Sequence, residues 1–279
     1  MIEVREWSRG DTARLFRPPT AEDDKYARGV VALRTGSPAY PGAAVLGVEA
    51  AWRAGAGFVR YVGADRVADA VLARRPETVV GADVGSSRVG AWVIGSGTDP
   101  SHRTDEESLA LREILAGTTP VVIDAGALDL APGARAPFLV TPHAREFTRL
   151  QERLRVQPHD EDDDRADAAR QVAAKIGGAV LLKGARTLIA DPDGGVIAVE
   201  AGTGWLATAG SGDVLAGVLG AVMAANPGAA LAEVAAAGAW LHGHAARIAA
   251  GERDGGPGHP IVAMDVAEAL PHAVQDVLG

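Results

Sequence analysis

Short apolar runs alternate with longer segments of mixed polarity along most of the chain. The runs are rich in Val, Ile and Leu, are bounded by Gly, Asp or Pro, and occupy residues 30–33, 58–62, 91–94, 121–123, 138–140 and 179–182. Their length and β-branched content are typical of buried parallel strands. Segments with helical character lie between several of them, at residues 43–54, 106–115 and 164–176. This alternation predicts an α/β fold built from strand–helix–strand units.

The pattern changes after residue 182. Apolar runs at 187–190 and 196–199 flank the turn-forming sequence Asp-Pro-Asp-Gly-Gly. Two strands around such a turn predict a β-hairpin, so we expect the sheet to end in an antiparallel portion.

Helices are predicted in the remaining C-terminal part of the chain, at residues 212–225, 229–251 and 265–278. The first two are separated by Asn226-Pro227-Gly228, which cannot continue a helix, and Pro271 is expected to kink or break the third. The acidic run at 159–164 is interpreted as a solvated loop that leads into a helix, in preference to a cation site.

The composition agrees with a globular α/β protein. Apolar residues make up 47% of the 279 positions but aromatic residues only 4%, which suits short buried strands packed against Ala-rich helices. A chain of this length is at the upper end of what one α/β core organises. We expect a single domain over residues 1–279.

The charge and the cysteine content limit which partners and which cellular compartment are compatible with the sequence. A formal net charge of −9 argues against binding to nucleic acid, which depends on clustered Lys and Arg. The absence of Cys excludes disulfides and thiolate metal sites. The charged start MIEVREWSRGD does not resemble a signal peptide, and charged or His residues interrupt the most apolar helical segment, at 229–250. We therefore expect a cytoplasmic protein without membrane contact.

The glycine-rich turn Thr208-Ala209-Gly210-Ser211-Gly212-Asp213 is the segment with the clearest chemistry. Because it precedes a helix, successive backbone N–H groups can form a concave nest at the helix start, where an anion is favoured. Asp213, in the first turn, stabilises the helix dipole in the simplest interpretation. It is also suited to take a proton from a hydroxyl group that attacks a phosphoryl group bound in the nest.

Around this turn, the run GTGWLATAGSGDVLAGVLGAVMA resembles the signature of the ADP-dependent NAD(P)H-hydrate dehydratase family in the ribokinase-like superfamily. Further segments match that family in order, at residues 36–44 (GSPAYPGAA), 94–98 (IGSGT), 141–147 (Thr-Pro-His, then Glu146-Phe147) and 181–187 (Leu-Leu-Lys-Gly, then Thr187). The resemblance implies a three-layer α/β/α sandwich with a mostly parallel central sheet and an antiparallel hairpin edge.

The resemblance also implies an activity. Members of the family transfer a phosphoryl group from ADP or ATP to the hydroxyl of hydrated NADH or NADPH and eliminate phosphate, which makes them carbon–oxygen lyases that repair nicotinamide nucleotides. Mg²⁺ would accompany the nucleotide, although no protein ligand for it is assigned. A homotetramer or larger assembly is implied, with the Ala-rich helix at 229–250 as a candidate interface.

Individual residues acquire roles by the same resemblance. Asp213 would be the catalytic base, beside an anion hole formed by Ala209, Gly210, Ser211 and Gly212. The adenine nucleotide would be held by Gly212 and by Lys183, Gly184, Ala185, Arg186 and Thr187. The hydrated dinucleotide would contact Asp213 and also Ala43, Gly97 and His143.

Plainer interpretations remain for several of these residues. His143 follows a strand and an X-Pro pair and could serve only the structure, and Lys183 could simply solvate the end of a strand. His242 and His244, two residues apart on a helix, point in different directions and suit a core or interface position better than a shared metal site. Ala209 stands where the family commonly has Gly, and a left-handed backbone there would cost about 1 kcal/mol or more.

Two other functions are compatible with the sequence. One is a ribokinase-like small-molecule kinase of the hydroxyethylthiazole or sugar type, which phosphorylates a hydroxyl and stops. The other is a non-catalytic nucleotide-binding protein that keeps the fold. The 141–147 and 36–44 segments favour the dehydratase over the kinase, and Asp213 argues against the non-catalytic protein.

Overall fold

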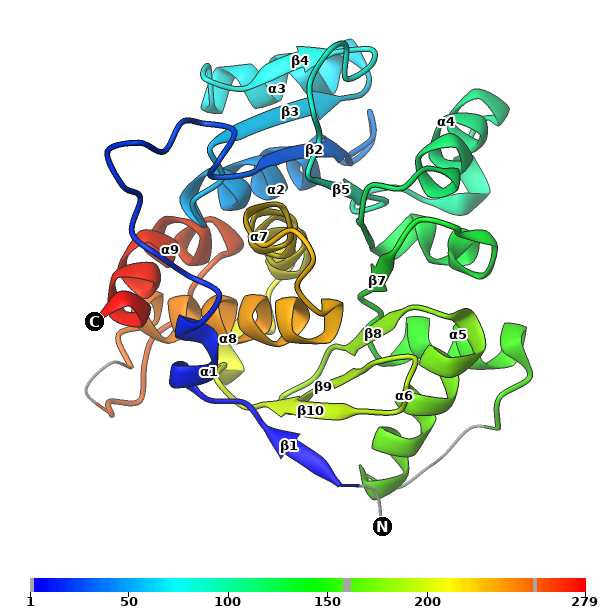
Figure 1. Cartoon of the computed structure of the whole chain (residues 1–279), viewed down its shortest axis with the longest axis vertical. Helices are drawn as coiled ribbons and strands as arrows, with labels where there is room; N and C mark the ends of the chain where they lie inside the picture. Colours follow the sequence, from blue (N-terminus) through cyan, green and yellow to red (C-terminus); the bar gives the residue numbers. More distant parts are fainter. Residues whose placement is uncertain (1–2, 158–161, 253–254) are drawn as a thin grey trace.

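The structure is a computed structural model that describes residues 3–157, 162–252 and 255–279 (Figure 1). Its centre is one ten-stranded sheet with the order β1-β10-β9-β8-β7-β6-β5-β2-β3-β4. The strands are β1 (Val4–Glu6), β2 (Val30–Arg34), β3 (Phe58–Val62), β4 (Val79–Gly81), β5 (Ala91–Ile94), β6 (Val121–Ile123), β7 (Phe138–Val140), β8 (Ala179–Leu182), β9 (Thr187–Ala190) and β10 (Val196–Val199). All the apolar runs predicted as strands are strands, and most of their side chains are buried.

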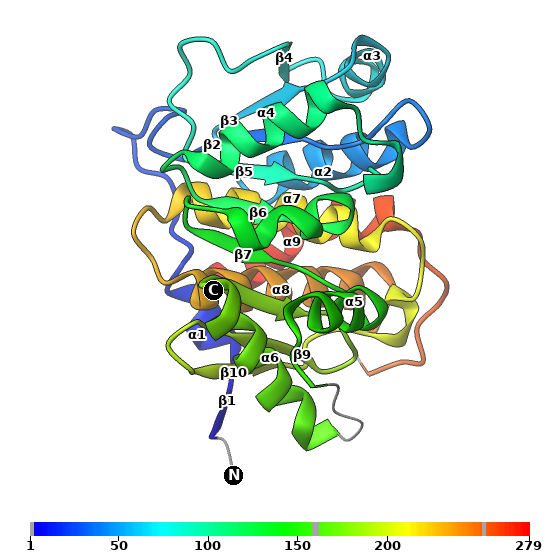
Figure 2. The ribbon, with the colours of Figure 1, turned by 90° about the vertical axis from the view of Figure 1, so that its right-hand side faces the viewer.

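Helices cover both faces of this sheet and complete three layers (Figures 1 and 2). One layer contains α1 (Arg9–Ala13), α2 (Pro41–Arg53), α3 (Asp65–Arg74), α7 (Ser211–Ala225), α8 (Leu231–Ala249) and α9 (Ala263–Leu278). The other contains α4 (Asp105–Ala116), α5 (Ala144–Leu154), α6 (Asp162–Ile176) and the 3-10 segment η2 (Ala125–Gly133). Two further 3-10 turns are η1 (Pro100–His102) and η3 (Gly204–Leu206). A separate apolar core lies between the sheet and each layer.

The antiparallel part of the sheet is the predicted hairpin. β9 is antiparallel to both β8 and β10, and the other strand pairs are parallel. The outermost strand at this end is β1, which pairs with β10 and was not predicted. Its sequence is Val-Arg-Glu and it is only partly buried, so it lacks the apolar run by which a strand is recognised.

Pro271 does not break α9, which is one helix from Ala263 to Leu278. Val266, Leu270 and Val277 are buried on either side of the proline. Tertiary packing of this apolar face therefore offsets the backbone hydrogen bond that proline removes.

The acidic run is not simply a loop. Its residues 159–161 lie outside the described residues, and 162–164 already form the first turn of α6.

The Ala-rich helix α8 is a core helix. It packs against α7, α9 and four strands of the sheet, and Arg247 is the one exposed residue along its length. Small side chains let these neighbours approach closely, so most of α8 is buried within the chain. No helix in the described part of the chain is long and apolar enough to span a membrane.

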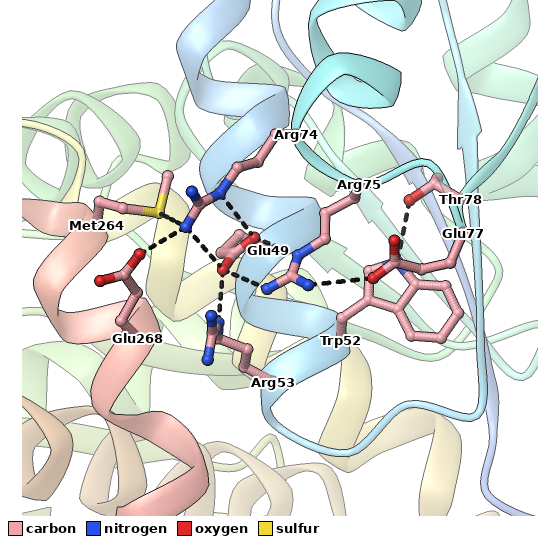
Figure 3. Close-up of polar contacts among 9 residues, drawn as sticks. All are labelled: Glu49, Trp52, Arg53, Arg74, Arg75, Glu77, Thr78, Met264 and Glu268. Atoms are coloured by element: carbon pink, nitrogen blue, oxygen red, sulfur yellow. Dashed lines mark hydrogen bonds and ion pairs between the residues drawn. The ribbon is translucent and has the colours of Figure 1, made fainter.

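A buried carboxylate connects three helices beside this core (Figure 3). Glu49 of α2 is fully buried and accepts hydrogen bonds from Arg53 at 2.5 Å, from Arg75 just after α3, and from Arg74 at 3.3 Å. Arg74 also pairs with Glu268 of α9 at 2.6 Å. The cluster ties α2 to α3 and α9, and α2 in turn packs on α7, which begins at the glycine-rich turn.

Candidate active site

The carboxyl ends of the neighbouring parallel strands β5, β6, β7 and β8 carry the polar residues of the site. They are followed by Gly95-Ser96-Gly97, Asp124, Thr141 and Lys183, respectively. Open α/β sheets bind ligands at this edge, because the loops that leave the strands diverge there.

Asp124 is the centre of these strand ends. Its buried carboxylate accepts hydrogen bonds from Ser96 Oγ at 2.9 Å, Thr141 Oγ1 at 2.7 Å and Lys183 Nζ at 2.9 Å. Burial alone would raise the pKa of Asp124, but the Lys183 ammonium and the three hydrogen bonds hold it below its usual range. Asp124 is therefore ionised and holds the lysine in place.

Asp124 was not among the site residues predicted from the sequence. One signal was present, since an acidic residue directly follows the apolar run 121–123 and so stands at the carboxyl end of a predicted strand. Its partner Lys183 is 59 residues away along the chain. That separation is the reason why the pairing is evident only in the folded protein.

Lys183 extends from β8 toward the start of α7. Its Nζ lies 3.9 Å from Glu146 Oε2, and a Cβ built on Gly212 would lie 3.6 Å from it. Burial lowers the pKa of Lys183, but the charges of Asp124 and Glu146 outweigh this effect and raise it overall. The lysine thus remains protonated beside the glycine-rich turn. Its role is therefore more than to solvate the end of a strand.

The glycine-rich turn has the geometry of an anion nest. Gly210 is the N-cap of α7 and is left-handed, with φ 89°. The amides of Ser211 and Gly212 follow at the helix start, where N–H groups lack acceptors within the helix. The Ser211 hydroxyl donates back to the carbonyl oxygens of Leu206 and Thr208 and braces the loop, so the backbone N–H is what Ser211 offers to an anion.

Ala209 is not strained. Its φ is negative, because the left-handed position of the turn is Gly210, one residue later. The strain considered for Ala209 in the sequence analysis is therefore absent.

Asp213 stands in the first turn of α7, close to this nest and to Lys183. Burial raises its pKa to about 6, the negative charge of Asp124 adds to the rise, and the charge of Lys183 partly offsets it. A carboxylate with a pKa near the working pH is suited to accept a proton in a reaction and to release it afterwards.

A cavity of about 480 Å³ opens beside the nest. Its lining includes the predicted nucleotide residues Lys183, Gly184, Ala185, Thr187 and Gly212, together with Ser211. Arg186 takes another direction and pairs with Glu6 of β1 and with Glu200, directly after β10. The volume is within the roughly 300–1,000 Å³ of small-molecule sites.

The predicted dinucleotide residues Ala43 and Gly97 lie against each other. A Cβ added to Gly97 would approach Ala43 Cβ to 2.3 Å and Gly36 Cα to 3.2 Å. Gly36 and the loop after it also line a second cavity, of about 430 Å³, which continues to Tyr61 and Arg103. Small residues thus let the loop after β2 and the loop after β5 meet at the carboxyl end of β5.

His143 has a structural task in addition to any contact with a ligand. Its Nδ1 accepts hydrogen bonds from the backbone N–H of Arg145 at 3.1 Å and of Glu146 at 3.3 Å, and so caps α5. Its side chain is half exposed, which leaves Nε2 accessible near Glu146. His143 therefore has a structural role as the N-cap of α5, and its contact with the dinucleotide stays a prediction.

The acidic side chains do not form a metal cage. Within the described ranges, no group of three or more His, Asp or Glu side chains is placed to hold a metal ion.

The chain is similar to several characterised enzymes. A model of the NAD(P)H-hydrate dehydratase family matches residues 31–260. The bifunctional NAD(P)H-hydrate repair enzyme Nnr of Mycobacterium leprae is 43% identical over 256 residues, which are 89% of this chain and 51% of the relative. The ADP-dependent (S)-NAD(P)H-hydrate dehydratase of Neisseria meningitidis serogroup B is 38% identical over 251 residues, which are 84% of this chain and 81% of the relative.

A solved structure has the same fold over nearly the whole chain. The ADP/ATP-dependent NAD(P)H-hydrate dehydratase of Bacillus subtilis, co-crystallised with ATP and Mg²⁺, superposes with a TM-score of 0.84 and 26% identity. The superposition covers 99% of this chain and 100% of that one. The chain spans about half the length of the Mycobacterium leprae relative.

Proposed function

The chain belongs to the NAD(P)H-hydrate dehydratase family, and from this membership and the geometry at the strand ends we propose that it restores hydrated NADH or NADPH with ADP or ATP as phosphoryl donor. The observation that carries the proposal is the meeting of Asp213, Lys183 and the nest at Gly210–Gly212 beside a cavity of nucleotide size. A base, a fixed cation and backbone donors are the parts that phosphoryl transfer to a hydroxyl requires.

In the first step, Asp213 takes the proton of the hydroxyl on the hydrated nicotinamide ring. The hydroxyl oxygen attacks the terminal phosphorus of the donor, and the bond from this phosphorus to the bridging oxygen breaks. The amides of Ser211 and Gly212 stabilise the charge on the transferred group, and Lys183 stabilises it from the side of β8.

In the second step, the carbon–oxygen bond of the phosphorylated intermediate breaks and phosphate leaves with the bonding electrons. Loss of a proton from the adjacent ring carbon restores the double bond of the reduced nicotinamide. Because phosphate is a far better leaving group than hydroxide, the first step makes the second possible.

The positions of the predicted ligand contacts support separate places in the site for the adenine nucleotide and for the hydrated dinucleotide. The cavity at Lys183, Gly184, Ala185, Thr187 and Gly212 would hold the adenine nucleotide. Ala43, Gly97 and the accessible edge of His143 would contact the dinucleotide on the other side of Asp124. The direction of the Arg186 side chain restricts its role at the site to its backbone.

Mg²⁺ would enter with the nucleotide and, when bound, would neutralise charge on the phosphate oxygens.

We further propose that residues 1–279 act as one ribokinase-like domain and that the protein works as a homotetramer in the cytoplasm. The single continuous sheet supports the first point. Family membership is the support for the assembly, and the partly exposed side of α8 stays the candidate interface.

One assay tests the function against its alternatives. The protein is incubated with hydrated NADH, Mg²⁺ and ADP or ATP, and absorbance is followed at the band of the reduced nicotinamide. Recovery of NADH with release of phosphate is the expected result. Phosphorylation of another alcohol without recovery would favour the small-molecule kinase, and nucleotide binding without either reaction would favour the non-catalytic protein.

The Asp213→Asn variant is the internal control. It should fold and bind nucleotide but lose turnover by orders of magnitude, because the amide cannot accept the proton. Near-normal turnover in this variant would overturn the mechanism.

A further inference from the structure

A third cavity, of about 210 Å³, is lined by residues of η1, η2 and α5. Its wall contains Ala125, the residue directly after Asp124, and Glu146, whose carboxylate lies 3.9 Å from Lys183 Nζ. The cavity therefore borders the candidate active site at the ends of β6 and β8. It is smaller than the roughly 300–1,000 Å³ of sites that enclose a whole small molecule, so it suits one part of a larger ligand.

The cavity is close to two of the predicted dinucleotide contacts. Pro100 in its wall follows Gly97 by three residues along the loop after β5. The helix α5, which supplies another part of the wall, begins directly after His143. A dinucleotide that touches both Gly97 and His143 would therefore lie beside this cavity.

The positive charges in the wall are not balanced. The acidic residues there already have partners, since Asp129 pairs with Arg103 and Glu146 accepts a backbone hydrogen bond at 2.8 Å. Arg149 and Arg153 also line the cavity, are exposed, and lie four residues apart on one face of α5. Neither guanidinium group has an ion-pair or hydrogen-bond partner in the part of the chain that the structure describes. The cavity thus carries two positive charges that an anion can neutralise.

The backbone beside these charges is strained. Ala125 has φ 42°, in the left-handed region that residues with a Cβ rarely adopt. The Arg103 guanidinium holds the next turn, because it donates to the carbonyl oxygen of Gly126 at 2.6 Å and pairs with Asp129. Strained positions that are held in this way cluster where proteins bind ligands. The strain is therefore a second feature that distinguishes this wall from an ordinary charged surface.

We propose that Arg149 and Arg153 bind a phosphate group of the hydrated dinucleotide. The inference rests on the proposed function, in that this dinucleotide is the substrate. A guanidinium group suits the task because it stays charged and donates two parallel hydrogen bonds to phosphate oxygens. The arginines would act on binding of the substrate and not on the phosphoryl transfer, since Asp213 and Lys183 are the groups next to the glycine-rich turn.

The substrate has two sources of such a phosphate. The pyrophosphate that joins its two nucleosides is common to hydrated NADH and hydrated NADPH, whereas the 2′-phosphate belongs to NADPH only. A helix rises about 1.5 Å per residue, so Arg149 and Arg153 lie about 4.5 Å and about 10.5 Å along α5 from Glu146. The arginines thus lead away from Lys183, which favours the 2′-phosphate, the more distant of the two from the nicotinamide.

The experiment compares the original protein with the double variant Arg149→Gln/Arg153→Gln. The matched control is Arg112→Gln/Arg135→Gln, which removes the same charge from exposed arginines outside this cavity. Steady-state kinetics are measured with hydrated NADH and with hydrated NADPH at saturating ADP. We expect the double variant to raise KM for hydrated NADPH by roughly tenfold or more and to keep kcat within about twofold. The control should leave both constants within about twofold of the original.

The two substrates separate the sources of the phosphate. A rise in KM confined to hydrated NADPH assigns the arginines to the 2′-phosphate, and an equal rise for both substrates assigns them to the pyrophosphate. In either case, added salt should raise KM less in the double variant than in the original protein, because fewer charges remain to be screened.

Several results would overturn the proposal. They are an unchanged KM for both substrates, a change no larger than that of the control, or a fall in kcat at constant KM. Calorimetric binding of NADH and NADPH needs no turnover and tests the inference separately from the function. Weaker binding of NADPH to the double variant, in a protein that restores neither hydrated form, would contradict the proposed function and leave the inference intact. An original protein that binds neither NADH nor NADPH would overturn the inference.

Discussion

Replacement of Glu49 by Gln should destabilise the protein strongly, although the two side chains have nearly the same shape. Glu49 is fully buried, and the guanidinium groups of Arg53, Arg74 and Arg75 point at it (Figure 3). The amide cannot neutralise them, and its NH₂ group must face at least one donor. Removal of one partner from a buried ion pair typically costs about 3–5 kcal/mol.

The pKa of Glu49 gives a second estimate. Burial acts to raise it, but the three arginines lower it from 4.5 to about 2. A shift of this size corresponds to about 3 kcal/mol, since one pKa unit is about 1.4 kcal/mol. The arginine side chains are 21–40% exposed, so water screens part of this energy. We therefore expect the free energy of unfolding to fall by about 2–3 kcal/mol.

Urea denaturation at neutral pH measures this loss as a lower midpoint at unchanged slope. Glu77→Gln is the matched control, because Glu77 is an exposed partner of the same Arg75 and its loss should change stability by less than about 1 kcal/mol. The folded-state pKa of Glu49 is depressed, so its contribution is present above pH 4.5 and is lost as the pH falls toward about 2. A Glu49→Gln variant as stable as Glu77→Gln, or a difference that does not shrink in acid, would refute the reasoning.

Further predictions concern the site. Asp124→Asn should lower the free energy of unfolding by about 3 kcal/mol, because it leaves Lys183 without its buried partner, as urea denaturation can measure. The same change removes a charge that raises the pKa of Asp213, so the acid limb of the pH–rate profile should move to lower pH. An unmoved limb would contradict the electrostatic coupling between Asp124 and Asp213. In the unchanged protein, turnover should fall as the pH drops below about 6, where Asp213 becomes protonated, whereas a flat profile down to pH 5 would exclude it as the base. Gly97→Ala should raise KM for the hydrated dinucleotide at least tenfold. The added Cβ would approach Ala43 Cβ to 2.3 Å, and the backbone φ of 67° at this position disfavours alanine. Kinetics equal to those of the original protein would show that the loops separate freely.

Local features of the fold were determined by the sequence alone. The predicted strands and the hairpin are confirmed nearly residue for residue, because run length, β-branched content and turn residues act over a few neighbouring positions. The family resemblance and the ribokinase-like α/β/α fold are confirmed as well, since five ordered motifs span most of the chain. The strands β1 and β4 and the helices α1, α3 and α5 were not predicted, because their short or charged sequences are held by their neighbours in the fold.

The properties of the site depend on tertiary structure. The charge of Asp124, the position of Lys183 and the raised pKa of Asp213 all arise from residues far apart in the chain that meet at the ends of β6, β8 and the start of α7. The buried His242 and the buried Glu49 are of the same kind, as each requires that particular neighbours exclude water. Burial and electrostatic coupling depend on distance in space, so the sequence indicates which groups are present and only the folded chain decides how they titrate and what they can bind.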